Sequence, residues 1–190
     1  MQCYMSKKIA LPKSISVKSI AWDKTHGYIA CGGDNGVLKV LKLETRKEHT
    51  ASVVSSSSLS INQSLEGHAG TVSFVQWNEQ YEKLTSCDTN GFIMVWMEHK
   101  GIFLGIWYEE MVNNRQKSLV KGMAWNHDGS KICITYDDGV IIVGSVDGNR
   151  IWGKELKGLN LTCVEWSPDG RLLLLGCNSG EVHIYEFGGA

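Results

Sequence analysis

Four segments of the chain share one pattern of apolar and turn-forming positions, and they align without a gap. Each segment starts five residues before a tryptophan and carries a glycine 14 residues after that tryptophan. A turn-forming residue precedes each glycine, and a β-branched residue follows it by four positions. The pairs are Trp22 and Gly36, Trp77 and Gly91, Trp125 and Gly139, and Trp166 and Gly180. Agreement at this many positions indicates an internal repeat.

Each copy of the repeat predicts three strands joined by tight turns. In the third copy, the first strand covers residues 120–125 and ends at Trp125, and turn-forming residues 126–129 follow. An aspartate caps such a turn, and a glycine accepts the positive φ angle that it needs. Residues 131–135 form the second strand, and a turn with Gly139 leads into the third. This order is typical of consecutive β-hairpins.

The spacing of the copies indicates which kind of repeat this is. Successive tryptophans are 55, 48 and 41 residues apart, and a WD-type blade has about 40–45 residues in four strands. Outer fourth strands fit at residues 60–65, 107–112 and 149–156, and none follows the last copy. We therefore predict an all-β fold, an incomplete WD40-type β-propeller of about four blades of four-stranded antiparallel sheet. The predicted blades cover residues 13–66, 67–115, 116–157 and 158–190.

Two segments lie outside the blade pattern. Residues 45–60 contain six serines and show little periodicity, so we predict a flexible Ser-rich loop between the third and fourth strands of the first blade. Residues 7–11 precede the first copy and predict one additional strand.

The residues that the repeat singles out are predicted to be structural. We expect the four repeat tryptophans to be largely buried at equivalent places in successive blades. Gly67-His68 together with Trp96 resembles the WD signature, in which a His, a Ser or Thr, an Asp and a Trp form a buried hydrogen-bonded network. The predicted members are His68, Ser86, Asn90 and Trp96. The other copies carry Leu41, Gly144 and Tyr185 at the position of Trp96, so we expect packing to hold those blades.

No pattern in the sequence predicts catalysis. The glycine-rich residues 31–36 lack the Lys-Ser/Thr pair of a phosphate-binding loop. The acidic pairs Glu109-Glu110 and Asp137-Asp138 are adjacent residues, and adjacent side chains on a strand point to opposite faces. The six histidines and six cysteines show no metal-ligand spacing. We therefore predict no catalytic residue, no cofactor, no metal and no small-molecule substrate.

Charge and hydropathy narrow the classes of partner. The formal net charge is −1, so no basic field favours nucleic acid. No apolar stretch approaches the ~18 residues that span a bilayer, and no signal peptide is evident. We expect free cysteines in a reducing compartment, which is the cytoplasm, and no direct membrane insertion.

Several stretches are more specific than a generic blade. They are residues 5–12, 30–44, 77–81, 107–115, which begin Trp-Tyr-Glu-Glu-Met, and 143–157, which contain Gly-Ser-Val-Asp-Gly-Asn-Arg-Ile-Trp-Gly-Lys. Together they resemble the N-terminal region of the WD-repeat 35 type subunits of intraflagellar transport complex A. In that family two propellers precede a long helical tail, so the resemblance implies that this chain is a fragment, a splice product or a truncated gene model.

The resemblance also implies a role. It implies a non-catalytic scaffold that acts in retrograde ciliary transport and cilium assembly. The implied partners are other subunits of complex A and ciliary membrane cargo, and the implied locations are the cytoplasm, the basal body and the axoneme. The WD portion of a tubby-like protein shares the Trp-Asn-Glu and Val-Gly-Ser-Val phrases. That alternative implies a substrate adaptor for a ubiquitin ligase.

Overall fold

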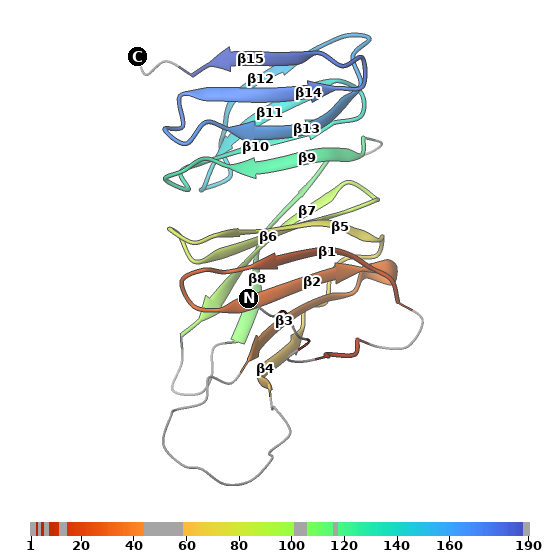
Figure 1. Ribbon diagram of the computed structural model, residues 1–190, viewed down its shortest axis with the longest axis vertical. Coiled ribbons are helices and arrows are strands. Elements are labelled where there is room, and N and C mark those ends of the chain that lie inside the picture. The colour runs from red at the N-terminus through yellow and green to blue at the C-terminus, as the bar shows by residue number, and fades with distance from the viewer. Residues whose placement is uncertain are drawn as a thin grey trace, which may run out of the picture.

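Four antiparallel sheets stacked one on the next make up most of the described structure, which also has a 3-10 helix, η1 (Asp34–Gly36), between two strands of the first sheet (Figure 1). The computed structural model describes residues 3, 5, 8–11, 15–43, 59–100, 106–115 and 118–187. The first sheet contains β1 (Val17–Trp22), β2 (Tyr28–Gly33), β3 (Leu38–Leu43) and β4 (Leu59–Ser64). The second contains β5 (Val72–Asn78), β6 (Lys83–Asp88), β7 (Phe92–His99) and β8 (Ile106–Asn114).

The other two sheets repeat the same arrangement. The third contains β9 (Val120–Trp125), β10 (Lys131–Tyr136), β11 (Val140–Ser145) and β12 (Arg150–Glu155). The fourth contains β13 (Leu161–Trp166), β14 (Leu172–Cys177) and β15 (Val182–Glu186). Strands that are consecutive in the chain are neighbours in every sheet. The prediction of an all-β chain built from propeller blades is confirmed, and the fourth blade has three strands in the described part of the chain.

The repeat seen in the sequence is also a repeat of register. Each first strand carries its tryptophan at or next to its last residue, and that tryptophan lies opposite an apolar residue of the second strand. These pairs are Trp22 with Ile29, Trp77 with Leu84, Trp125 with Ile132, and Trp166 with Leu173. The four tryptophans therefore occupy equivalent positions, as predicted.

The repeat glycines lie in the turns between second and third strands, where the backbone requires them. Their φ values are +72° at Gly36, +84° at Gly91, +81° at Gly139 and +86° at Gly180. A Cβ atom at Gly36 would lie 1.9 Å from the His68 carbonyl oxygen, and one at Gly139 would lie 2.4 Å from the Leu156 carbonyl oxygen. At these two turns the chain passes so closely that only glycine fits.

The core lies between the sheets and forms three clusters. One joins the first and second sheets and includes Tyr28, Val40, Leu84 and Trp96. One joins the third and fourth and includes Ile141, Val143, Leu173 and Leu175. The remaining cluster lies between the second and third sheets and includes Ile93, Ile132 and Ile134. Each sheet thus buries its apolar faces only by stacking on a neighbour, as repeat architectures do.

The tryptophans connect one sheet to the preceding one. The Trp77 indole N–H donates to the Ala21 carbonyl oxygen at 3.1 Å, and the Trp166 indole N–H donates to the Ala124 carbonyl oxygen at 3.1 Å. The Trp125 indole N–H donates to Thr85 Oγ1 at 3.2 Å. Each of these tryptophans is therefore covered by the sheet before it.

The prediction that all four tryptophans are largely buried is wrong for Trp22. Its exposed fraction is 63%, against 5% for Trp166, and Trp77 and Trp125 are half-buried. The reason follows from the stacking, because in the described residues no sheet packs on the side of β1 that carries Trp22. Ile20 on the same side is 71% exposed.

The predicted Ser-rich loop and the predicted additional strand at residues 7–11 differ in part from the structure. Of the predicted Ser-rich loop, residues 45–58 lie outside the described residues. Leu59 and Ser60 belong to β4, not to a loop, because Leu59 pairs with Leu43 and the Ser60 hydroxyl donates to the Lys42 carbonyl oxygen. Of the additional strand predicted at residues 7–11, residues 8–11 are described and form no strand, because no sheet edge pairs with them.

None of the helices in the described residues has the length and apolar character needed to cross a bilayer.

Replacing Trp166 with Ala should cost about 3–5 kcal/mol of unfolding free energy, because a buried aromatic side chain and its hydrogen bond are lost together. Replacing Trp22 with Ala removes an exposed side chain and should change the stability by about 0.5 kcal/mol or less. Urea unfolding followed by far-ultraviolet circular dichroism measures both. Equal losses in the two variants would contradict the stacking of each tryptophan on the preceding sheet.

Candidate interaction site

A buried hydrogen-bonded network lies in the second sheet. His68 Nε2 is 2.7 Å from Ser86 Oγ, and the Trp96 indole N–H donates to the same oxygen at 2.8 Å. The exposed fractions are 8% for His68, 0% for Ser86 and 2% for Trp96. Three of the four predicted members are thus brought together.

The fourth member is Asp88, and the prediction of Asn90 in this role is wrong. Asp88 is buried, and its Oδ2 lies 3.2 Å from His68 Nδ1. Asp88 ends β6, so its carboxylate reaches both the imidazole and the turn that follows. Its Oδ1 accepts hydrogen bonds from the backbone N–H groups of Asn90 and Phe92. Asn90 is exposed on the outer side of that turn. The Ser-x-Asp spacing from Ser86 was the sequence signal that would have identified Asp88.

Burial sets the protonation state of His68. Desolvation lowers the pKa of His68 below its ordinary value of 6.5, and the nearby Asp88 carboxylate opposes this effect without overcoming it. The contact between His68 Nδ1 and the carboxylate is close but not well directed as a hydrogen bond. The negative charge of the Asp88 carboxylate favours the tautomer with the proton on Nδ1. The unprotonated Nε2 then accepts a hydrogen bond from the Ser86 hydroxyl. The imidazole is therefore neutral near pH 7.

The network fixes the connection between the first two sheets. Asp88 Oδ2 accepts the backbone N–H of Gly70 at 3.1 Å, and the His68 backbone passes directly over the turn at Gly36. In the third sheet an acidic pair has a comparable role, since Asp138 Oδ2 accepts from Arg115 and from the Ser118 hydroxyl, both at 2.8 Å. These polar groups hold the linkers between strands in place.

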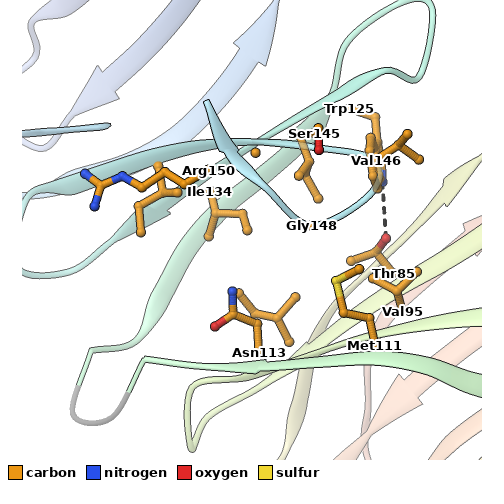
Figure 2. Close-up of a pocket in the computed structure, with 14 residues that line it drawn as sticks. Thr85, Val95, Met111, Asn113, Trp125, Ile134, Ser145, Val146, Gly148 and Arg150 are labelled. Atoms are coloured by element: carbon orange, nitrogen blue, oxygen red, sulfur yellow. Dashed lines mark hydrogen bonds between the residues drawn. The ribbon is translucent and has the colours of Figure 1, made fainter. Parts of the chain in front are cut away.

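An apolar cleft opens between the second and third sheets (Figure 2). The Trp125 indole and Thr85 close one end of it through their hydrogen bond, and Arg150 and Asn113 lie toward the other. We call it the inter-blade cleft, and it encloses about 80 Å³. Its lining residues are Thr85, Ile93, Val95, Met111, Asn113, Trp125, Ile132, Ile134, Ile142, Gly144, Ser145, Val146, Gly148 and Arg150. Sequence analysis missed this cleft, because it forms only where two faces from different blades meet.

The described residues do not gather the groups of a metal or nucleophile site. Among them no three His, Cys, Asp or Glu side chains are placed to hold a metal ion. The described cysteines are free thiols. Burial raises the pKa of Cys31, raises that of Cys87 to about 12, and raises that of Cys133. Buried thiols with raised pKa values pack as small apolar groups and are poor nucleophiles.

Comparison with known proteins identifies the family. The family described as WDR35/TULP4 N-terminal matches residues 1–190. The chain belongs to this family. It is 57% identical over 185 residues to WD repeat-containing protein 35 of Rattus norvegicus, covering 96% of this chain and 16% of that protein. It is 35% identical over 185 residues to Tubby-related protein 4 of Homo sapiens, covering 96% of this chain and 11% of that protein. The resemblance noted from the sequence is confirmed.

Two more distant proteins are also similar to this chain. The chain is 25% identical over 123 residues to Intraflagellar transport protein 172 homolog of Homo sapiens, covering 61% of this chain and 7% of that protein. A chain in the crystal structure of the mitotic checkpoint complex superposes with a TM-score of 0.71 at 20% identity, covering 93% of this chain and 49% of that one. The structural match concerns the fold alone. The chain spans only about a sixth of the length of the 57% identical relative.

Replacing Asp88 with Ala should cost about 3–5 kcal/mol, because the backbone N–H groups of Gly70, Asn90 and Phe92 lose a charged acceptor at once. Replacing Asn90 with Ala leaves its backbone N–H in place and should cost about 0.5 kcal/mol or less. Thermal or urea unfolding of the two variants distinguishes the roles. A larger loss for Asn90→Ala would restore Asn90 to the network.

The stability of the chain should depend on pH through His68. Unfolded His68 takes up a proton as the pH falls below about 6.5, whereas the folded residue, with its lowered pKa, resists protonation. Its contribution is therefore present above that pH and is lost as the pH falls toward the folded pKa. Between pH ~7.5 and ~5 the wild-type chain should lose more unfolding free energy than His68→Gln. Parallel pH profiles for the two proteins would show that His68 is not the titrating group.

Proposed function

We propose that this chain is a non-catalytic WD-repeat interaction module of the intraflagellar transport machinery. The observation that carries the proposal is its 57% identity to WD repeat-containing protein 35 over 96% of the chain. The match to a relative named for intraflagellar transport supports the same assignment. The architecture suits this role, because stacked blades present loops and clefts at fixed positions for partner proteins.

The proposed partners are other subunits of intraflagellar transport complex A and ciliary membrane cargo. The proposed locations are the cytoplasm, the basal body and the axoneme, and the proposed processes are retrograde ciliary transport and cilium assembly. Support comes from the family assignment. The buried carboxylate Asp88 and the acidic pair at Asp137 and Asp138 bind backbone and linker groups of the chain itself, which agrees with a scaffold and not with an enzyme.

A second candidate function is a WD-repeat substrate adaptor that recruits a ubiquitin ligase. The identity to Tubby-related protein 4 over 96% of the chain favours it. At 35% this identity is well below the 57% to the WD repeat-containing protein 35, so we place the transport role first.

Localising and purifying the tagged chain from ciliated cells tests the proposal. We expect signal at the ciliary base and along the axoneme, together with co-purification of complex A subunits. The matched control is the Trp166→Ala variant at equal expression, which should lose both because its fold is impaired. A diffuse cytosolic signal with a co-purified ligase scaffold would overturn the transport role and favour the adaptor.

A further inference from the structure

We infer that the inter-blade cleft is a binding site for a bulky apolar side chain of an extended, acidic peptide. This inference rests on the proposed interaction role, since it names the chemistry of a partner. Three observations lead to it, and they concern how the cleft arises, what lines it and which charge lies at its rim.

The cleft exists because glycine replaces a large side chain at one position of the repeat. The third-strand residue that faces the preceding sheet is Trp96 in β7, Gly144 in β11 and Tyr185 in β15. Their register is the same, since each lies opposite the second-strand residue that pairs with the repeat tryptophan. Trp96 is buried in the cluster between the first and second sheets. Tyr185 packs against Trp152, with ring centroids 5.8 Å apart.

A second difference removes another aromatic side chain. The β7–β8 pairing continues past Trp96 to His99 and Ile106, and this places Trp107 in the cluster between the first two sheets. The β11–β12 pairing ends at Gly144 and Arg150, where a short turn reverses the chain. The third sheet therefore has no counterpart of Trp107, and Gly148 lines the cleft instead.

The walls and size of the cleft suit one apolar side chain. Isoleucines from β7, β10 and β11, together with Val95 and the Met111 side chain from β8, supply apolar walls on both sides of the cleft. Figure 2 shows Ile134, Val95 and Met111 among them. The volume of about 80 Å³ is roughly half that of a ~150 Å³ cavity that accepts benzene. Burying a Leu-sized side chain there contributes about 1.5–3 kcal/mol, or roughly tenfold to a hundredfold in affinity.

The charge in the lining of the cleft is positive, and Asp147, in the turn between Val146 and Gly148, is exposed and is not part of that lining. Arg150 is the one charged residue among the described residues that line the cleft. Its side chain is exposed and takes part in none of the ion pairs of the described residues. Asn113 and Ser145 add groups that can hydrogen-bond to a peptide backbone. An apolar residue flanked by Asp or Glu complements this surface.

Gly144 offers a way to close the cleft without breaking the fold. Its φ angle is not in the positive range, and a Cβ atom there would have its nearest neighbours at 3.5 and 3.8 Å. Leu at this position should fill the cleft as Trp96 fills the corresponding space. Ala adds one methyl group, leaves most of the space free, and serves as the matched control.

The test is binding of three fluorescent decapeptides to the full chain, each with a central Leu and flanked by Asp and Glu, by Lys and Arg, or by Ser. We expect the acidic peptide to bind best and to shift the methyl NMR signals of Met111, Ile132 and Ile134. Gly144→Leu should weaken binding about tenfold or more, while Gly144→Ala weakens it about threefold or less. Arg150→Glu should reverse the preference between acidic and basic flanks, whereas Arg171→Glu, on the exposed β13–β14 turn, should not.

Three results of the peptide experiment would overturn the inference, and a fourth would come from self-association. The first three are unchanged binding in Gly144→Leu that remains folded by circular dichroism, a preference for basic flanks, and methyl shifts outside the cleft. Self-association that Gly144→Leu abolishes, without peptide binding, would assign the cleft to a second copy and would also contradict it. If the peptide does not bind while the chain still localises to the cilium, the inference fails and the proposed function stands. If the peptide binds while ciliary localisation is lost, only the proposed function fails.

Discussion

The indole of the first-strand tryptophan donates a hydrogen bond to the preceding sheet, and the stacking of the blades depends on this contact. A single four-stranded sheet with two apolar faces is marginal on its own, so each blade needs a neighbour. Trp77 and Trp166 reach the backbone carbonyls of Ala21 and Ala124, which are residues that precede the tryptophan of the neighbouring blade. The same bond therefore fixes both the distance and the register between blades.

Differences between the interfaces follow from the side chains that fill the space beside these tryptophans. Trp96 and Trp107 fill it between the first two sheets, and Tyr185 and Trp152 pack between the last two. Gly144 leaves it open between the second and third. The two filled interfaces hold pairs of blades together, and the open one provides a cleft lined from both sides. Stability and binding thus depend on one structural position that the repeat varies from blade to blade.

The sequence predicts the local structure well, because strands and tight turns depend on nearby residues. The tryptophan spacing placed the first strands, and the glycines at Gly36 and Gly139 marked turns that permit no side chain. Burial was less predictable, since it depends on the neighbouring sheet, and Trp22 differs from Trp166 for that reason alone. The position of the network carboxylate was missed by two residues. Asp88 and Asn90 border the same turn, and Asp88, two residues after Ser86, is the one that faces His68.

The cleft could not be predicted from the sequence. The glycine at position 144 is visible in the aligned copies. Whether it leaves a cleft depends on the side chains of β7 and β8 that lie opposite it. A cavity requires two surfaces, and their distance is set by the tryptophan contacts and not by either surface alone. Trp125 is the tryptophan at this interface, and it bonds to a side chain, Thr85, where its equivalents bond to backbone.

Native-state hydrogen exchange as a function of denaturant tests most directly whether the blades stack in two pairs joined by a weaker interface. We expect the slowest amides of β1–β3 and β5–β7 to share one opening free energy and those of β9–β11 and β13–β14 to share another. The Trp166→Ala substitution should then lower only the second value. A single opening free energy for all four sheets, lowered equally by that substitution, would show instead that the blades unfold as one unit and that the interface at Gly144 is no weaker than the others.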